Sequence, residues 1–367
     1  MELLIAGNLA NHGYNLAKLL RERRVSADLL IKKNPKETED PRSADTKLND
    51  YPDWIRFWDG NKPTWKFQVI RIMREYEVIH ASTELPIFAQ FSGRPFVAYT
   101  TGADIVKLAQ ENSLKGWLLR RAYRKAAVVI FPTPYLDKYV KKLEMKNAIF
   151  IPILPDYTKF TPDPTVLKDS VRFTIFHPTN HLWSYKKNDR FLRAFVKLAK
   201  ERNDIHLIMI NRGPDFDRSM EILNTPSTKG KFTVIDKTLE QNELLKFYNQ
   251  ADVVVDQFGV GSTGLIGQEV MACEKPLIQY IDKTLYETFY SEAPPIVNAS
   301  NEEEIYVALS KLINDRELCK KIGKESREWL LKHHNHDKII RKYIHVYTVV
   351  KDRMNFQKIK DTLLSIG

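Results

Sequence analysis

The chain is poor in cysteine and contains no long apolar run. Its only cysteines are Cys273 and Cys319 among 367 residues, which excludes a disulfide framework and favours a reducing, cytoplasmic compartment. No segment approaches the roughly 20 consecutive apolar residues of a membrane-spanning helix, and residues 1–7 lack the basic start and apolar length of a signal peptide. A hydrophobic share of 43% and a charged share of 28% exclude collagen-like, low-complexity and wholly disordered chains.

Patterns typical of metal or nucleic-acid binding are also missing. His333, His334 and His336 would point in different directions from one helix, so no metal site is expected. The chain carries 57 Lys and Arg against 46 Asp and Glu, a net charge of +11, which favours anionic partners such as phosphates or acidic lipid. Because no nucleic-acid-binding module is present, no nucleic-acid partner is expected.

Short apolar runs recur along the chain, and segments with the spacing of an amphipathic helix lie between them. This alternation predicts parallel sheets with helices on both faces, and two such sets predict an α/β fold of two doubly wound, Rossmann-like domains. The expected strands are residues 3–6, 29–31, 78–81, 96–99, 128–131 and 149–151 in the first set, and 173–176, 207–210, 232–235, 253–255 and 277–281 in the second.

A proline-rich segment marks the boundary between the two sets. Residues 152–164 contain four prolines and little periodicity, which is typical of a linker. Single cores stop growing at about 250–300 residues, so the length also favours two domains. We expect domains over residues 1–160 and 161–345, followed by a basic helical tail over residues 346–367 that could pack back on the first domain.

A glycine-rich segment follows the predicted strand 253–255 and opens a helix. Ser262, Thr263, Gly264 and Leu265 stand at the start of that helix, where unpaired N–H groups favour a phosphate. Glu269, five residues beyond Gly264, could accept hydrogen bonds from ribose hydroxyls. The alternative is a glutamate that is favoured there only by the helix dipole.

A second candidate loop, residues 177–189, follows the predicted strand 173–176. Loops at the carboxyl ends of strands bind ligands in doubly wound sheets, and Lys186 there could neutralise a diphosphate. An ordinary solvated pair of Lys186 and Lys187 explains the pattern equally well. His177 and His181 straddle a proline, so a metal pair at these positions is not expected.

Two segments of the first domain have competing interpretations. The turn 6–13 could bring backbone N–H groups to an anion, but it lacks the dinucleotide fingerprint, and a plain strand–helix turn is favoured on this evidence alone. The segment 114–125 places five basic residues among Trp117, Leu118 and Tyr123. It resembles a helix that lies on anionic lipid, and a core-packing helix with a basic outer face fits equally well.

Taken together, these segments resemble a GT-B glycosyltransferase of the retaining family-4 type. Residues 248–255, 264–265 and 269–278 are similar to that family's "Y..AD..V … GL … EAMA.G.PV". Residues 155–162 resemble its "VD…F.P" signature, and residues 97–104 resemble its "v.t.HG.D".

The resemblance implies two domains that face a cleft. It also implies transfer of a sugar from a nucleotide-sugar donor to a glycan or lipid-linked acceptor, with retention and without metal or cofactor. Contact with an anionic membrane through residues 114–125 would suit a lipid-linked acceptor.

The resemblance also assigns site residues. Lys186, Glu269, Asp104 and Thr101 match catalytic positions, where Thr101 replaces the family's histidine. The donor contacts carried over or inferred are Gly13, Asn180, His181, Lys186, Ser262, Thr263, Gly264, Leu265 and Glu269. The sequence departs from the family pattern at Gly261, which stands in place of the first of two glutamates, at Asn180, which replaces an arginine, and at Lys187, which replaces a glycine. These departures leave open an alternative, a related protein that binds nucleotide-sugar as a binding or scaffold component but has lost turnover.

Overall fold

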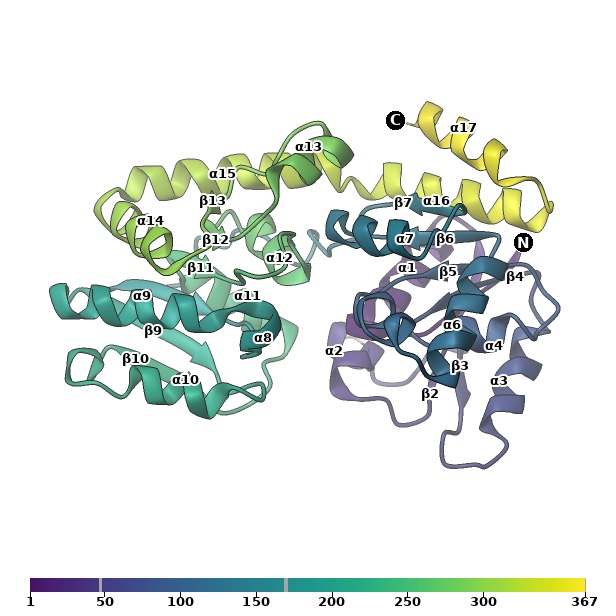
Figure 1. Ribbon diagram of the computed structural model, residues 1–367, viewed down its shortest axis with the longest axis horizontal. Helices are drawn as coiled ribbons and strands as arrows, with labels where there is room; N and C mark the ends of the chain where they lie inside the picture. The colour runs from purple at the N-terminus through teal and green to yellow at the C-terminus, as the bar shows by residue number, and fades with distance from the viewer. Residues whose placement is uncertain (46–47, 168–170, 367) are drawn as a thin grey trace. The chain divides into compact units, whose positions relative to one another are not determined.

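The computed structural model describes residues 1–45, 48–167 and 171–366. The chain divides into two compact units, one formed by Met1–Leu154 together with His334–Gly367 and the other by Pro155–His333. Both units are α/β, as the alternation of short apolar runs with amphipathic helical segments predicts (Figure 1). Within the described residues, no helix is long and apolar enough to cross a bilayer.

The first unit is built on a parallel sheet of seven strands in the part of the chain that is described, in the order β3-β2-β1-β4-β5-β6-β7. All six predicted strands are present. The strand that the sequence did not predict, β3, lies at the sheet edge, where only Ile55 is fully buried. The bounds are β1 Glu2–Ala6, β2 Ser26–Lys32, β3 Ile55–Trp58, β4 Val78–Ser82, β5 Phe96–Tyr99, β6 Val128–Phe131 and β7 Ala148–Phe150.

Helices cover this sheet with apolar faces of the predicted spacing. In α1, for example, Leu16, Ala17 and Leu20 are buried against the core. The bounds are α1 His12–Glu22, α2 Pro41–Ala44, α3 Trp65–Met73, α4 Pro86–Ala89, α5 Ala103–Val106, α6 Leu114–Lys125, α7 Asp137–Lys142, α16 His336–Lys351 and α17 Phe356–Ile366, with 3-10 turns η1 Leu9–Asn11, η2 Glu37–Glu39, η3 Leu108–Gln110 and η4 Pro134–Leu136.

The C-terminal part of the chain completes the first unit. Helix α16 packs against α1, β4 and β5, and its Tyr347 hydroxyl lies 2.9 Å from His80 Nδ1. This returning segment begins at His334, whose Nδ1 lies 2.9 Å from the carbonyl oxygen of Ile153. The expected boundary between residues 345 and 346 therefore falls inside α16, because the buried face of that helix runs without a break from Ile339 to Val350.

The second unit holds a parallel sheet of six strands, counted over the described residues, in the order β10-β9-β8-β11-β12-β13. The five predicted strands are present, and the two-residue strand β13 was not predicted. The strands are β8 Phe173–His177, β9 Ile205–Ile210, β10 Phe232–Ile235, β11 Val253–Val255, β12 Leu277–Gln279 and β13 Val297–Asn298. The helices are α8 Trp183–Lys186, α9 Asn188–Glu201, α10 Phe216–Leu223, α11 Gln241–Gln250, α12 Leu265–Ala272, α13 Lys283–Tyr290, α14 Glu302–Asn314 and α15 Arg316–His333, with the 3-10 turn η5 Pro226–Thr228.

Candidate functional site

The two predicted anion-binding loops of the second unit lie against each other. They follow β8 and β11, which are parallel neighbours, so both loops begin at the carboxyl ends of adjacent strands, on the same side of the sheet. The backbone N–H of Phe258 donates to the carbonyl oxygen of Lys186 at 2.8 Å. A Cβ at Gly259 would overlap the carbonyl oxygen of Tyr185, so this close approach requires glycine.

A buried carboxylate stands beside Lys186. Asp256 directly follows β11 and is 1% exposed, and its Oδ1 lies 3.8 Å from Lys186 Nζ. Thr179 donates its hydroxyl hydrogen to the same oxygen. The Lys186 side chain is 22% exposed, so a partly exposed lysine is paired with a buried carboxylate. Asp256 was not among the predicted site residues, although a polar residue at the carboxyl end of a buried strand is a signal for one.

His177, at the start of the 177–189 loop, forms hydrogen bonds with two other elements. Its Nδ1 lies 2.8 Å from the carbonyl oxygen of Val255, and its Nε2 lies 3.1 Å from Asn188 Nδ2. Burial lowers the pKa of His177 to about 4, so the ring is neutral and Nδ1–H donates to Val255. The Asn188 side chain also accepts from the N–H of Leu182 at 3.1 Å. His177 thus connects β11 to the start of α9.

Asn180 and His181 face the loop that follows β9. His181 Nδ1 lies 2.7 Å from Ser219 Oγ, and burial lowers the pKa of His181 to about 3. Among the described residues, neither Asn180 Oδ1 nor His181 Nε2 has a hydrogen-bond partner. A Cβ at Gly213, where φ is +111°, would overlap Asn180 Oδ1. Both are buried polar atoms, which are satisfied in most proteins by a protein group or an ordered water molecule.

The hydroxyl groups of Ser262 and Thr263 turn toward Tyr286 of α13. Tyr286 Oη accepts from the N–H of Thr263 at 2.7 Å, and it lies 2.7 Å from Thr263 Oγ1 and 3.2 Å from Ser262 Oγ. In this structure the two side chains therefore stabilise the turn. The phosphate contact predicted for the N–H groups at the start of α12 stays a prediction. A Cβ at Gly264 would meet nothing within 4 Å, so the N-terminus of α12 is open there.

Glu269 lies one turn further along α12 and is partly buried. The Tyr248 hydroxyl of α11 donates to its Oε2 at 2.9 Å. Burial raises the pKa of Glu269 to about 7, although the bond from Tyr248 acts in the opposite direction. The carboxyl group therefore changes its charge near neutral pH. Tyr248 was not among the predicted site residues either.

The remaining predicted residues belong to the first unit. Asp104 is buried, and its Oδ1 accepts from the N–H groups of Thr101, Gly102 and Ile105, each at 2.9 Å, while burial raises its pKa to about 6. These bonds hold the turn after β5, so Asp104 stabilises that turn and Thr101 contributes its N–H. A Cβ at Gly13 would overlap the carbonyl oxygen of Gly7, so glycine at position 13 allows the start of α1 to pack against the turn that follows β1.

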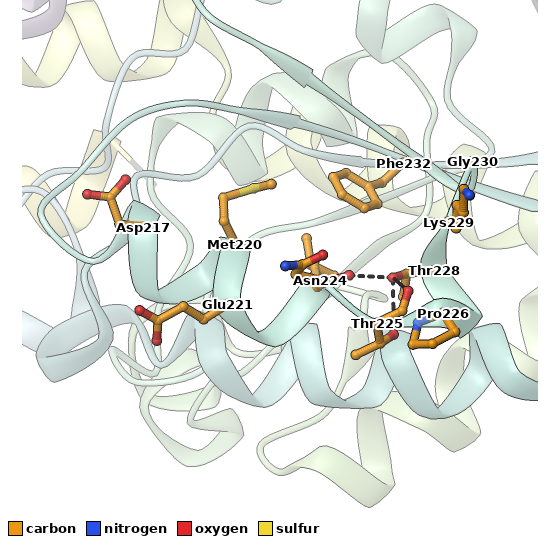
Figure 2. Close-up of a pocket in the computed structure, with 11 residues that line it drawn as sticks. Asp217, Met220, Glu221, Asn224, Thr225, Pro226, Thr228, Lys229, Gly230 and Phe232 are labelled. Atoms are coloured by element: carbon orange, nitrogen blue, oxygen red, sulfur yellow. Dashed lines mark hydrogen bonds between the residues drawn. The ribbon is translucent and has the colours of Figure 1, made fainter.

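A separate hollow lies elsewhere in the second unit (Figure 2). Its volume is about 790 Å³, and α10, η5 and β10 supply its lining, including Met220, Thr225 and Phe232. The residues predicted for the functional site are not among those that line it.

Two family models match the chain. The model described as glycosyl transferases group 1 matches residues 170–329, and the model of glycosyltransferase family 4 matches residues 9–152. The two matches fall on the second and the first sheet, respectively.

Individual relatives are distant in sequence but similar in fold. The N-acetyl-alpha-D-glucosaminyl L-malate synthase of Bacillus anthracis is 22% identical over an alignment of 301 residues, and the match covers 76% of this chain and 76% of that protein. The structure of Anabaena HepE in complex with UDP and glucose matches with a TM-score of 0.75 at 12% identity, covering 95% of this chain and 99% of that one. Sucrose-phosphate synthase from Thermosynechococcus elongatus matches with a TM-score of 0.70 at 13% identity, covering 95% and 98%.

Proposed function

The chain belongs to the GT-B glycosyltransferases of the family-4 type, and from that premise we propose that it takes its sugar from a uridine-diphosphate donor. The acceptor is a glycan or a lipid-linked glycan, the anomeric configuration is retained, no metal takes part, and the reaction occurs in the cytoplasm. The donor proposal rests on the pairing of Lys186 with Asp256 between two loops that follow neighbouring strands, the second of which leads into the glycine-rich start of α12. The similarity to HepE, whose structure contains UDP, supports uridine as the base.

The diphosphate binds between Lys186 and the first turn of α12. The ammonium and the free N–H groups near Gly264 and Leu265 supply positive charge in fixed positions. When the glycosidic bond breaks, negative charge grows on the leaving phosphate, and groups already in place stabilise it without reorganisation. These groups supply the charge that a divalent cation supplies in other transferases, which supports a reaction without metal.

The ribose is bound by Glu269. An ionised carboxylate accepts hydrogen bonds from two adjacent hydroxyls, and Tyr248 fixes the orientation of that carboxylate. Retention follows if the acceptor attacks from the face that the leaving group vacates and gives its proton to the departing phosphate oxygen. In this pathway no side chain is needed as the nucleophile.

Calorimetry with UDP, GDP and ADP tests the donor pocket. We expect UDP to bind most tightly, and Lys186→Ala to weaken binding by about 10- to 100-fold, the value of one or two charge-assisted hydrogen bonds. Lys229→Ala, which removes an exposed lysine beside the separate hollow, is the control and should change nothing.

A donor panel of UDP-sugars, with the anomeric product followed by NMR, tests turnover and retention. An inverted product would refute retention. Tight UDP binding without turnover of any donor would instead favour the binding-protein alternative.

A further inference from the structure

Helix α6 has two different faces. Its bounds match the predicted segment 114–125, and Leu119, Ala122 and Tyr123 are buried in the first unit. On the other side, Leu114 is 74% exposed and Trp117 is 49% exposed. One face therefore packs in the core, as one interpretation expects, while the other leaves large apolar groups in water.

The exposed face of α6 continues onto neighbouring elements. Phe67 on α3 is 74% exposed, and Phe91, just after α4, is 45% exposed. Helix α4 contacts both α3 and α6 (Figure 1). The Arg121 guanidinium lies 5.6 Å from the ring of Phe91 and 6.0 Å from that of Trp117. These residues form one patch, which we call the basic–aromatic surface (Phe67, Phe91, Leu114 and Trp117).

Basic side chains surround this surface. Phe67 and Phe91 border a groove of about 1140 Å³ that is also lined by Lys62, Arg71 and Arg74. Arg124 lies seven residues beyond Trp117 on α6, and so on the same face of that helix.

Two acidic side chains beside the surface are already paired. Glu75 lies 3.0 Å from Arg56, and Glu84 pairs with Lys115. Among the residues that the structure describes, Lys62, Arg71, Arg74 and Arg124 form no ion pair, so they add positive charge around the apolar groups.

We propose that the basic–aromatic surface docks the protein onto an anionic lipid bilayer. Of the nine large apolar side chains that are exposed among the described residues, four gather here. Exposed apolar clusters of this kind mark interaction surfaces. A bilayer accepts aromatic side chains at the depth of its head groups, while its phosphates attract the surrounding lysines and arginines. The docking goes beyond the sugar transfer proposed above and is tested separately from it.

Vesicle sedimentation tests the docking. The full chain should bind vesicles made of equal parts phosphatidylglycerol and phosphatidylcholine, should bind pure phosphatidylcholine at least about tenfold more weakly, and should lose affinity as salt rises. The double variant Phe67→Ser, Trp117→Ser should lose about tenfold or more of the affinity for the anionic vesicles. Arg71→Gln with Arg124→Gln should lower it to a similar extent.

The matched control is Leu167→Ser with Val307→Ser, which changes two exposed apolar side chains of the other unit and should leave vesicle binding unchanged. Absence of binding at low salt, equal binding to both kinds of vesicle, or equal losses in the variant and the control would each overturn the proposal. So would a dimer in solution that the Phe67→Ser, Trp117→Ser variant abolishes, since a second copy would then cover the surface. UDP binding, measured in parallel, should be unchanged in every variant, and this separates failed docking from failure of the donor site.

Discussion

Tyr248 on α11 and Glu269 on α12 share a hydrogen bond of 2.9 Å between the tyrosine hydroxyl and Oε2. Helix α12 begins directly after the second anion-binding loop, and the ring of Phe160, from the proline-rich linker, lies 5.9 Å from the Tyr248 ring. A carboxyl group with a pKa of about 7 is thereby fixed in the proposed donor pocket. The charge of that group is the first target for experiment.

Donor binding should depend on pH through Glu269. The ionised form binds ribose, so UDP affinity should fall as the pH drops below about 7 and should level off above it. Binding should also release a proton near pH 6–7, because the ligand favours the ionised form. Calorimetry in buffers of different ionisation enthalpy measures both effects. Glu269→Gln should bind weakly at every pH, and an unchanged pH profile in that variant would contradict the assignment.

Without ligand, the raised pKa of Glu269 makes the folded state more stable at low pH than at high pH. The folded state holds the Glu269 proton more tightly than the unfolded state, so this group contributes stability below a pH of about 4.5 that is lost as the pH rises through about 7. The melting temperature of the wild type relative to that of Glu269→Gln should therefore fall between pH 5 and 7.5.

Removing the Tyr248 hydroxyl should change both the affinity and the pKa. Tyr248→Phe deletes one hydrogen bond to the ionised carboxylate, so UDP affinity should fall by about three- to tenfold, and the pH midpoint of binding should move upward. Tyr306→Phe is the matched control, because Tyr306 donates to Glu201 at 2.6 Å on the exposed side of α14. A loss of affinity of equal size in the control would show that the effect is not specific to Glu269.

Asp256 should act through Lys186. Asp256→Asn removes the buried anion that holds the ammonium, and we expect KM for the donor to rise by about tenfold with a smaller change in kcat. In the Lys186→Ala background the same substitution should add little, since the two residues form one unit. Asp204→Asn, which breaks an exposed 2.7 Å pair with Arg202, should leave KM unchanged.

Two glycines of the same loop should respond differently to alanine. Gly259→Ala forces a Cβ onto the Tyr185 carbonyl, so it should lower the free energy of unfolding by about 1–3 kcal/mol and weaken UDP binding as well. Gly264→Ala adds a methyl group in open space and should leave the melting temperature unchanged while it impedes the phosphate. Thermal melts and calorimetry on both variants check this. Equal melting temperatures would refute the close packing of the two loops.

Local patterns determined most of the fold. The strand 78–81, the helical face of Leu16 and Leu20, and the glycine-rich start of α12 each depend on residues that are near one another in the chain, so the sequence alone predicts them. The same holds for Lys186 and Glu269 as candidates, because each follows a buried strand.

Contacts between distant residues were decided only by the tertiary structure. The edge strand β3 pairs with β2, and three of its four side chains are only partly buried. Asp256 meets Lys186 across 70 positions, and the hydroxyls of Ser262 and Thr263 lie against Tyr286 of α13. The chain returns to the first unit from His334 onward. Each of these depends on which surfaces meet once the sheets have formed, and hydrophobic spacing records which face of a segment is buried but not what it is buried against.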